Sequence, residues 1–131
     1  MEAKELMIGD LVIHGFGGIG KITEIGNKTV VIKDDGFDTG DGMNEVSFAI
    51  NELKPIFITR KILEKNGFKF EQQGSLEVAI LKMKNRHPIT LEYIGWSDGR
   101  WSIHEHRLVV KYVHELQHAL RLCGVNKEIS I

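Results

Sequence analysis

Alternating apolar and polar residues, interrupted by glycine-rich segments, dominate the first part of the chain. This alternation predicts short β-strands at residues 11–13, 21–25, 28–33 and 45–50. The glycines between the first two strands predict a tight turn, and the aspartate- and glycine-rich segment 34–44 predicts a solvated loop. Short strands joined by glycine turns favour a small β-barrel, because closure hides the edges of the sheet.

Pro55 marks the predicted boundary between two modules, residues 1–54 and residues 55–131. Just after it, Thr59 is placed to cap a short helix, because its hydroxyl can accept a hydrogen bond from the first helical turn. Gly67 is placed to end that helix, since glycine adopts the left-handed conformation of helix C-termini at little cost.

The second module continues as a predicted antiparallel β-meander followed by a helix. The meander strands are expected at residues 68–72, 75–84, 89–95 and 100–104, and the helix at residues 109–123. The apolar side of this helix would cover the meander. The predicted fold class is therefore α+β, with an N-terminal small β-barrel followed by an antiparallel β-meander packed against a C-terminal helix.

The composition indicates a soluble globular protein. Of the 131 residues, 42% are hydrophobic and 27% are charged, which is typical of chains that fold around a hydrophobic core. The chain opens without a secretory signal pattern, and no apolar run approaches the roughly 18 residues of a membrane span. We therefore expect a cytoplasmic protein without a membrane segment. Cys123, the single cysteine, lies among apolar helix positions and is expected to be buried.

Charge is divided unevenly between the two predicted modules. The whole chain carries a formal net charge of −1, so its composition provides no general electrostatic attraction to nucleic acids or anionic membranes. Residues 1–54 carry five Lys/Arg and ten Asp/Glu, whereas residues 55–131 carry twelve and eight. We attribute the difference to the acidic segment 34–45.

The predicted C-terminal helix contains the sharpest enzyme-like motif of the sequence. His114, Glu115 and His118 match H-E-x-x-H, in which two histidines one helical turn apart bind Zn²⁺ and the glutamate activates the metal-bound water. This motif predicts, as one alternative, a zinc-dependent hydrolase with His114 and His118 as ligands and Glu115 as general base.

Two features of the same helix argue against that alternative. The histidines lie on the side opposite the apolar stripe, together with Lys111 and Arg121, whose positive charges oppose cation binding. The third ligand of the metzincin motif is also missing, because residue 124 is glycine where that motif requires histidine. We therefore expect a structural or solvent-facing histidine pair, no cofactor and no catalytic residue.

A basic turn with nearby tryptophans is the second candidate site. Its cations are Lys82, Lys84 and Arg86, and its aromatic residues are Trp96 and Trp101. Cations that contact phosphates and rings that stack on bases are typical of single-stranded nucleic-acid binding. The alternative is a solvated turn with both tryptophans packed beneath the C-terminal helix, and we favour this second interpretation.

Three sequence blocks carry a resemblance that covers most of the chain. They are LMIGDLV at residues 6–12, LKPIFIT running into ILEKNGF within residues 53–68, and VKYVHELQH at residues 110–118. These blocks resemble an uncharacterised protein family that is common in gut Bacteroidetes genomes, prophages and mobile elements. In that family the H-E-x-x-H stretch often carries glutamine at its second position or asparagine at its last. The resemblance therefore implies a phage-related origin and no known activity, and it weakens the hydrolase alternative.

A second resemblance is local. GDLVIH at residues 9–14, followed by GIGKI at residues 18–22, is similar to the small SH3-like barrel that binds RNA polymerase in transcription-repair and CarD-type regulators. It implies an SH3-like barrel for the first module and RNA polymerase as a testable partner.

Together these observations predict a non-enzymatic accessory or adaptor protein that acts by binding a partner protein. The alternatives are a zinc-dependent hydrolase that uses the H-E-x-x-H motif, and a nucleic-acid or RNA-polymerase-binding module. Stoichiometric metal would favour the hydrolase, whereas steeply salt-dependent retention on DNA or RNA would favour the nucleic-acid-binding module.

Overall fold

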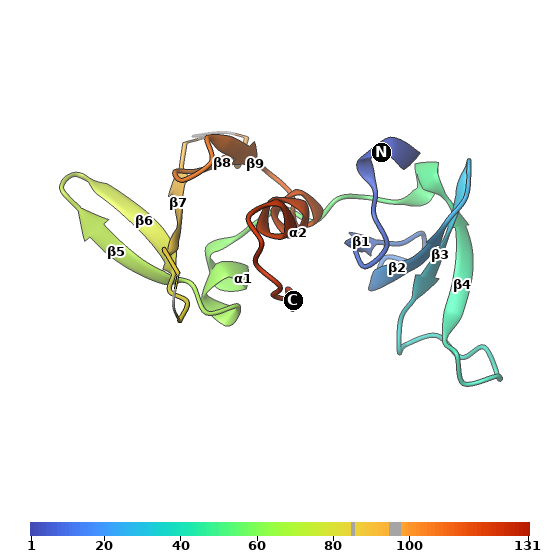
Figure 1. Ribbon diagram of the computed structural model, residues 1–131. Coiled ribbons are helices and arrows are strands. Elements are labelled where there is room, and N and C mark those ends of the chain that lie inside the picture. The colour runs from blue at the N-terminus through green and yellow to red at the C-terminus, as the bar shows by residue number, and fades with distance from the viewer. Residues whose placement is uncertain (85, 95–97) are drawn as a thin grey trace. The chain divides into compact units, whose positions relative to one another are not determined.

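Hydrogen bonding in the computed structural model produces two separate antiparallel sheets, one in each of two units (Figure 1). The structure describes residues 1–84, 86–94 and 98–131, and the units comprise Met1–Ile56 and Phe57–Ile131. The predicted α+β class is confirmed, because the described residues combine these sheets with α-helices. Within the same residues, no helix has both the length and the apolar character needed to cross a membrane.

The N-terminal unit contains a four-stranded sheet in which each strand pairs with the next along the chain. Its elements are η1 (Ala3–Glu5), β1 (Leu11–Ile13), β2 (Ile19–Ile25), β3 (Thr29–Lys33), β4 (Glu45–Ala49) and η2 (Ile50–Glu52). Alternate strand residues turn inward and form the core of the unit, as the apolar alternation predicts. This core consists of Leu6, Val12, Ile22, Val30, Ile32, Phe48, Ile50 and Leu53.

The sheet of the N-terminal unit does not close into a barrel. Its strand order is β1-β2-β3-β4, and the described residues show no ladder between β1 and β4. A single bridge, with N–O distances of 2.9 Å in both directions between Ile13 and Lys54, joins β1 to the segment after η2. One bridged pair is too short a ladder to close a barrel. The prediction of a closed SH3-like barrel is therefore wrong.

The C-terminal unit begins with the predicted short helix, α1 (Arg60–Lys65). The hydroxyl of Thr59 accepts a hydrogen bond from the backbone N–H of Ile62 at 3.2 Å, so the predicted cap is confirmed. Gly67 has a φ of 90°, which is the left-handed conformation expected where this helix ends.

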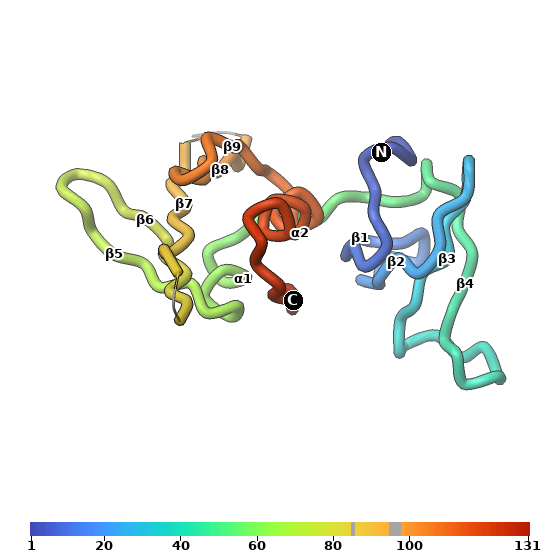
Figure 2. Tube along the Cα trace, viewed as in Figure 1, coloured from blue at the N-terminus to red at the C-terminus, as the bar shows by residue number. Residues whose placement is uncertain are grey.

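A five-stranded antiparallel meander follows α1. Its strands are β5 (Lys69–Gln73), β6 (Leu76–Leu81), β7 (Ile89–Tyr93), β8 (Trp101–Ile103) and β9 (Leu108–Val110). Figure 2 shows the trace of β5 and β6 running out to a hairpin turn and back. The four predicted meander strands are present, and β9 is an additional strand that the sequence pattern did not indicate.

The last helix, α2 (Val113–Leu122), starts later than predicted. Val109 and Val110, which we expected within the helix, belong to β9 and pair with β8. Their β-branched side chains favour extended backbone, and the ladder satisfies backbone groups that a first helical turn leaves without partners. Helix α2 contacts β9 and buries Leu116 and Leu120, and Cys123 is buried as predicted.

Candidate functional site

A tight turn between β1 and β2 holds an aromatic side chain in solvent. The Gly17 N–H donates to the carbonyl of His14, and the His14 N–H donates to the carbonyl of Gly18, each at 2.9 Å. Gly17 has a φ of 89°, which glycine adopts without strain. Phe16 lies within this turn and is 73% exposed. Backbone hydrogen bonds therefore fix the backbone position of Phe16.

Phe16 belongs to a group of four rings, His14, Phe16, Phe37 and Phe48, which we call the aromatic cluster. His14 stacks on Phe48 with ring centroids 5.2 Å apart, and its centroid lies 4.8 Å from that of Phe37. Phe16 packs edge-on against Phe48 at 5.1 Å and against Phe37 at 6.0 Å. His14 and Phe48 are buried, Phe37 is half-buried and Phe16 is exposed, so the cluster extends from the core of the unit to its surface.

His14 joins the turn to the loop of residues 34–44 through both ring nitrogens. The Phe16 N–H donates to His14 Nδ1 at 3.2 Å, so Nδ1 is an acceptor and carries no proton. In the neutral ring the proton then resides on Nε2, which donates to Asp34 Oδ2 at 2.7 Å. One buried side chain therefore orients both Phe16 and Asp34.

Asp34 anchors the loop beside the aromatic cluster. Its Oδ1 atom accepts a hydrogen bond from the Gly36 N–H at 2.9 Å. This backbone hydrogen bond, followed by the hydrogen bond from His14, lowers the pKa of Asp34 below the ordinary aspartate value. Asp34 is therefore ionised at neutral pH, where its carboxylate fixes the start of the loop.

The segment that carries Phe37 and Phe48 is acidic. Residues 34–53, which include Phe37 and Phe48, contain six Asp/Glu and no Lys or Arg. Asp41 accepts hydrogen bonds from the Thr39 hydroxyl and from the Met43 N–H, and the bond from Thr39 is the main cause of its lowered pKa. The negative charge therefore persists at neutral pH, where it attracts cations and repels anions.

Two glycines of the turn also allow close packing around the rings. A Cβ on Gly15 would lie 2.8 Å from Glu52 Oε2 and 3.2 Å from the Phe48 ring, and a Cβ on Gly18 would lie 2.8 Å from His14 Nε2. Such short separations are repulsive for carbon. The glycines thus form the predicted tight turn and, in addition, make room for the aromatic cluster.

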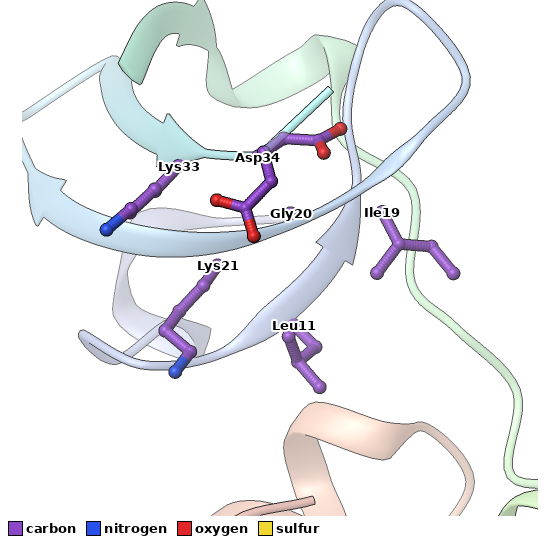
Figure 3. Close-up of a pocket in the computed structure, with 7 residues that line it drawn as sticks. Leu11, Ile19, Gly20, Lys21, Lys33 and Asp34 are labelled. Carbon is purple, nitrogen blue, oxygen red and sulfur yellow. The ribbon is translucent and has the colours of Figure 1, made fainter. Parts of the chain in front are cut away.

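A pocket of about 370 Å³ lies on the same sheet (Figure 3). It is lined by Leu11, Ile19, Gly20, Lys21, Lys33, Asp34 and Asp35. Lys21 and Lys33 are direct cross-strand partners on β2 and β3. Because lysines and aspartates share the lining, the pocket does not select a ligand of one sign of charge.

Glu115 of the H-E-x-x-H motif caps the N-terminus of α2. Its Oε1 atom accepts hydrogen bonds from the N–H groups of Lys111 and Tyr112, at 2.9 Å and 3.0 Å. The ring of His114 stacks on Tyr112, and His118 meets His114 edge-on, both with centroids 5.8 Å apart. Across the described ranges of the chain, no group of three or more His, Cys, Asp or Glu side chains is arranged to hold a metal ion.

Of the two orientations expected for the histidine pair, structural or solvent-facing, the burial of His114 fits the structural one. This residue is only 3% exposed, and His118 is half-buried. The sequence prediction assumed a helix with one buried stripe of apolar residues. Instead α2 also buries His114 and Gln117, so a larger part of its circumference is covered than hydrophobicity alone indicates.

The cations of the basic turn are in part engaged by the protein itself. Arg86 donates to the carbonyl oxygens of Cys123 and Gly124, just after α2, where cations also interact favourably with the helix dipole. Lys82 forms an ion pair with Glu71 at 3.6 Å. Lys84 is exposed. Arg86 thus has a structural role that the charge pattern did not indicate.

Trp101, one of the two predicted stacking residues, is packed inside the C-terminal unit. Trp101 is 6% exposed, with its ring centroid 5.1 Å from that of Tyr93 and 6.3 Å from that of Phe70. Its ring is therefore packed in the unit and is not presented for stacking on a base. Trp96, the other predicted stacking residue, lies outside the described residues.

Sequence reasoning missed the aromatic cluster, although one signal was present. Phe16 is flanked by Gly15 and Gly17, and an aromatic residue between two glycines at a predicted turn has no strand in which to be buried. The contacts with Asp34, Phe37 and Phe48 carried no such signal, because they join residues that are far apart along the chain.

Comparison with protein-family models, with curated proteins and with solved structures finds no match for this chain. In the aromatic cluster, an exposed ring and a fixed backbone coincide with an acidic segment of the chain, residues 34–53.

Proposed function

We propose that this chain is a non-catalytic adaptor that binds a partner protein through the exposed side of the aromatic cluster. The observation that carries the proposal is Phe16, a large apolar ring left 73% exposed. Burial of such a side chain is worth about 1.5–3 kcal/mol, and aromatic residues frequently dominate the binding energy of protein interfaces.

The rigidity of the turn supports this role. Hydrogen bonds between His14 and Gly17 and between His14 and Gly18 hold the backbone, while the imidazole of His14 holds the N–H of Phe16. A side chain that is already positioned loses less conformational entropy when a partner covers it. The turn therefore presents Phe16 as a preorganised contact.

The environment of Glu115 favours a binding protein over a hydrolase. Two backbone N–H groups donate to one oxygen of this carboxylate, as in a helix cap. In the proposed function Glu115 stabilises α2, and the protein uses no cofactor. The phage or mobile-element origin implied by the sequence resemblance fits an accessory role of this kind.

Site-specific crosslinking tests the proposal. A photo-reactive phenylalanine analogue replaces Phe16 in one sample and Phe57, a second exposed phenylalanine at 52%, in the control. Both proteins are irradiated in a lysate of the cells that encode the chain. The captured protein is then purified, and its affinity is measured for the parent chain, Phe16→Ala and Phe57→Ala.

We expect crosslinking from position 16 but not from position 57. Loss of Phe16 should weaken the purified complex by at least about 30-fold, which corresponds to the 2 kcal/mol of a typical interface hot spot. Equal binding by Phe16→Ala and the parent chain would contradict the proposal. Stoichiometric zinc in the purified protein, lost in His118→Ala, would instead support the hydrolase.

A further inference from the structure

We propose that the partner segment on the aromatic cluster carries an arginine or lysine next to an apolar residue, and that this cation lies against the rings of Phe16 and Phe37. The inference rests on the proposed function and specifies the chemistry of the occupant. Its basis is the combination of exposed aromatic surface and charge complementarity at one place in the N-terminal unit.

Two carboxylates lie at the aromatic cluster and favour a cation there: Asp34, which is hydrogen-bonded to His14, and Glu52, whose Oε2 atom lies next to Gly15. The six Asp/Glu of residues 34–53 have no compensating Lys or Arg within that segment. Asp35 and Asp38 are exposed in the loop that begins at Asp34. A phosphate group or an anionic lipid surface would be repelled by this segment, whereas a guanidinium or ammonium group would be attracted.

The rings offer a surface that such a cation can use. Phe16 meets Phe37 at an interplanar angle of 88° and Phe48 at 74°, so its neighbours touch it in edge-on geometry. With 73% of the residue exposed, much of the ring remains open to solvent. Arg and Lys bind favourably over such aromatic faces.

The C-terminal unit shows this pairing within the chain itself. The Arg60 guanidinium lies 4.1 Å from the centroid of Phe70, and the Lys111 ammonium lies 5.6 Å from that of Phe57. In the described residues no Lys or Arg lies over Phe16 or Phe37 in the same way. We infer that a partner supplies the cation at the aromatic cluster.

Three short peptides test this inference on the full chain. The first alternates leucine with arginine, the second replaces each arginine with citrulline, which is isosteric and uncharged, and the third replaces each arginine with glutamate. Binding is measured by calorimetry. Amide and ring NMR shifts of residues 14–18 and of Phe37 report where each peptide binds. Phe16→Ala is the site variant and Phe57→Ala its control.

The arginine peptide should shift the signals of the turn and bind at least about tenfold more tightly than the citrulline peptide. Raising the NaCl concentration from about 50 to about 300 mM should weaken binding of the arginine peptide several-fold, because added salt screens the attraction between its arginines and the carboxylates. Asp35→Asn and Asp38→Asn remove charge without touching the His14 network, and each should weaken binding by about two- to five-fold.

Equal binding of the arginine and citrulline peptides, or no shift in residues 14–18 with any peptide, would overturn the inference. The proposed function would survive that result if the captured protein still required Phe16. A complex that fails to depend on Phe16 would refute the proposed function itself. If the chain instead self-associates with concentration and loses this in Phe16→Ala, the occupant is a second copy.

Discussion

Trp101 and Phe16, one aromatic residue from each unit, differ sharply in exposure. In the C-terminal unit, Trp101 lies on β8, where Tyr93 and Val110 flank it as cross-strand partners, and it is only 6% exposed. In the N-terminal unit, Phe16 stands in a turn without strand partners and is 73% exposed. The larger ring is the buried one. Exposure is thus decided by the position of a residue in the sheet and not by its hydrophobicity.

Two carboxylates, Glu115 of the H-E-x-x-H motif and Asp34 of the aromatic cluster, differ in how far along the chain their hydrogen-bond partners lie. Glu115 binds backbone N–H groups three and four residues before it and stabilises the helix that contains it. Asp34 binds His14, twenty positions away along the chain, and joins a loop to a turn. A local carboxylate stabilises one element, whereas a long-range carboxylate holds two distant segments together.

Truncation of Trp101 is expected to give the largest effect. Trp101→Ala should destabilise the C-terminal unit by about 3–5 kcal/mol, because it leaves a large cavity between Tyr93 and Phe70. Amide hydrogen exchange measures the two units separately and should show faster exchange in β7, β8 and β9. Unchanged exchange in these strands would contradict the view that Trp101 is a core residue.

Loss of the helix cap should have a smaller effect. Glu115→Ala is expected to destabilise the C-terminal unit by about 1 kcal/mol, because the N–H groups of Lys111 and Tyr112 lose their acceptor. Glu115→Gln should destabilise the C-terminal unit less, since the amide oxygen still accepts a hydrogen bond. Denaturant unfolding measures both. Equal stability of the alanine variant and the parent chain would show that the cap is unimportant.

Acid should destabilise the N-terminal unit through Asp34. Because hydrogen bonds from Gly36 and His14 lower the pKa of Asp34 in the folded unit, the unfolded chain takes up the proton first. Ionised Asp34 therefore stabilises the folded unit fully at pH values above the ordinary aspartate pKa. This stabilisation is lost as the pH falls through the lowered pKa of Asp34 in the folded unit. Asp34→Asn should reduce this pH dependence.

NMR monitors the denaturation midpoint of the N-terminal unit at pH values from about 6 to about 2. Asp41→Asn is the matched control, because the pKa of Asp41 is also lowered but its partners, Thr39 and Met43, lie within its own loop. If Asp34→Asn and the parent chain lose stability in parallel, the His14–Asp34 pair does not support the unit.

Phe16→Ala should have the smallest effect on stability. A side chain that is 73% exposed loses little burial when it is truncated, so we expect a change within about 0.5 kcal/mol in either direction. Thermal unfolding and amide exchange of the N-terminal unit provide the measurement. Destabilisation comparable to that of Trp101→Ala would mean that Phe16 is a core residue, and the contrast between the units would fail.

Local sequence patterns predicted the elements well where backbone and side chain act over short distances. All strands except β9 follow from the sequence pattern, and the cap of α1 follows from Thr59, whose hydroxyl acts three residues away. The start of α2 was missed because Val109 and Val110 suit the apolar stripe of a helix and the pleat of a strand equally, and pairing with β8 decides between them.

The candidate site was less predictable than the fold. The H-E-x-x-H motif and the basic turn stood out in the sequence because their residues are close together. Yet Glu115 caps a helix and Arg86 binds the carbonyls after α2. The aromatic cluster did not stand out, because it gathers its rings from a turn, a loop and a strand.

The sequence by itself therefore determined most of the secondary structure, the α+β class and the acidic character of residues 34–53. These features depend on periodicity, capping and charge, which act between neighbouring residues. Only the tertiary structure decided that Phe16 is exposed and that His14 connects it to Asp34. Such outcomes depend on which distant strands and loops pack together, and that packing is a property of the folded chain as a whole.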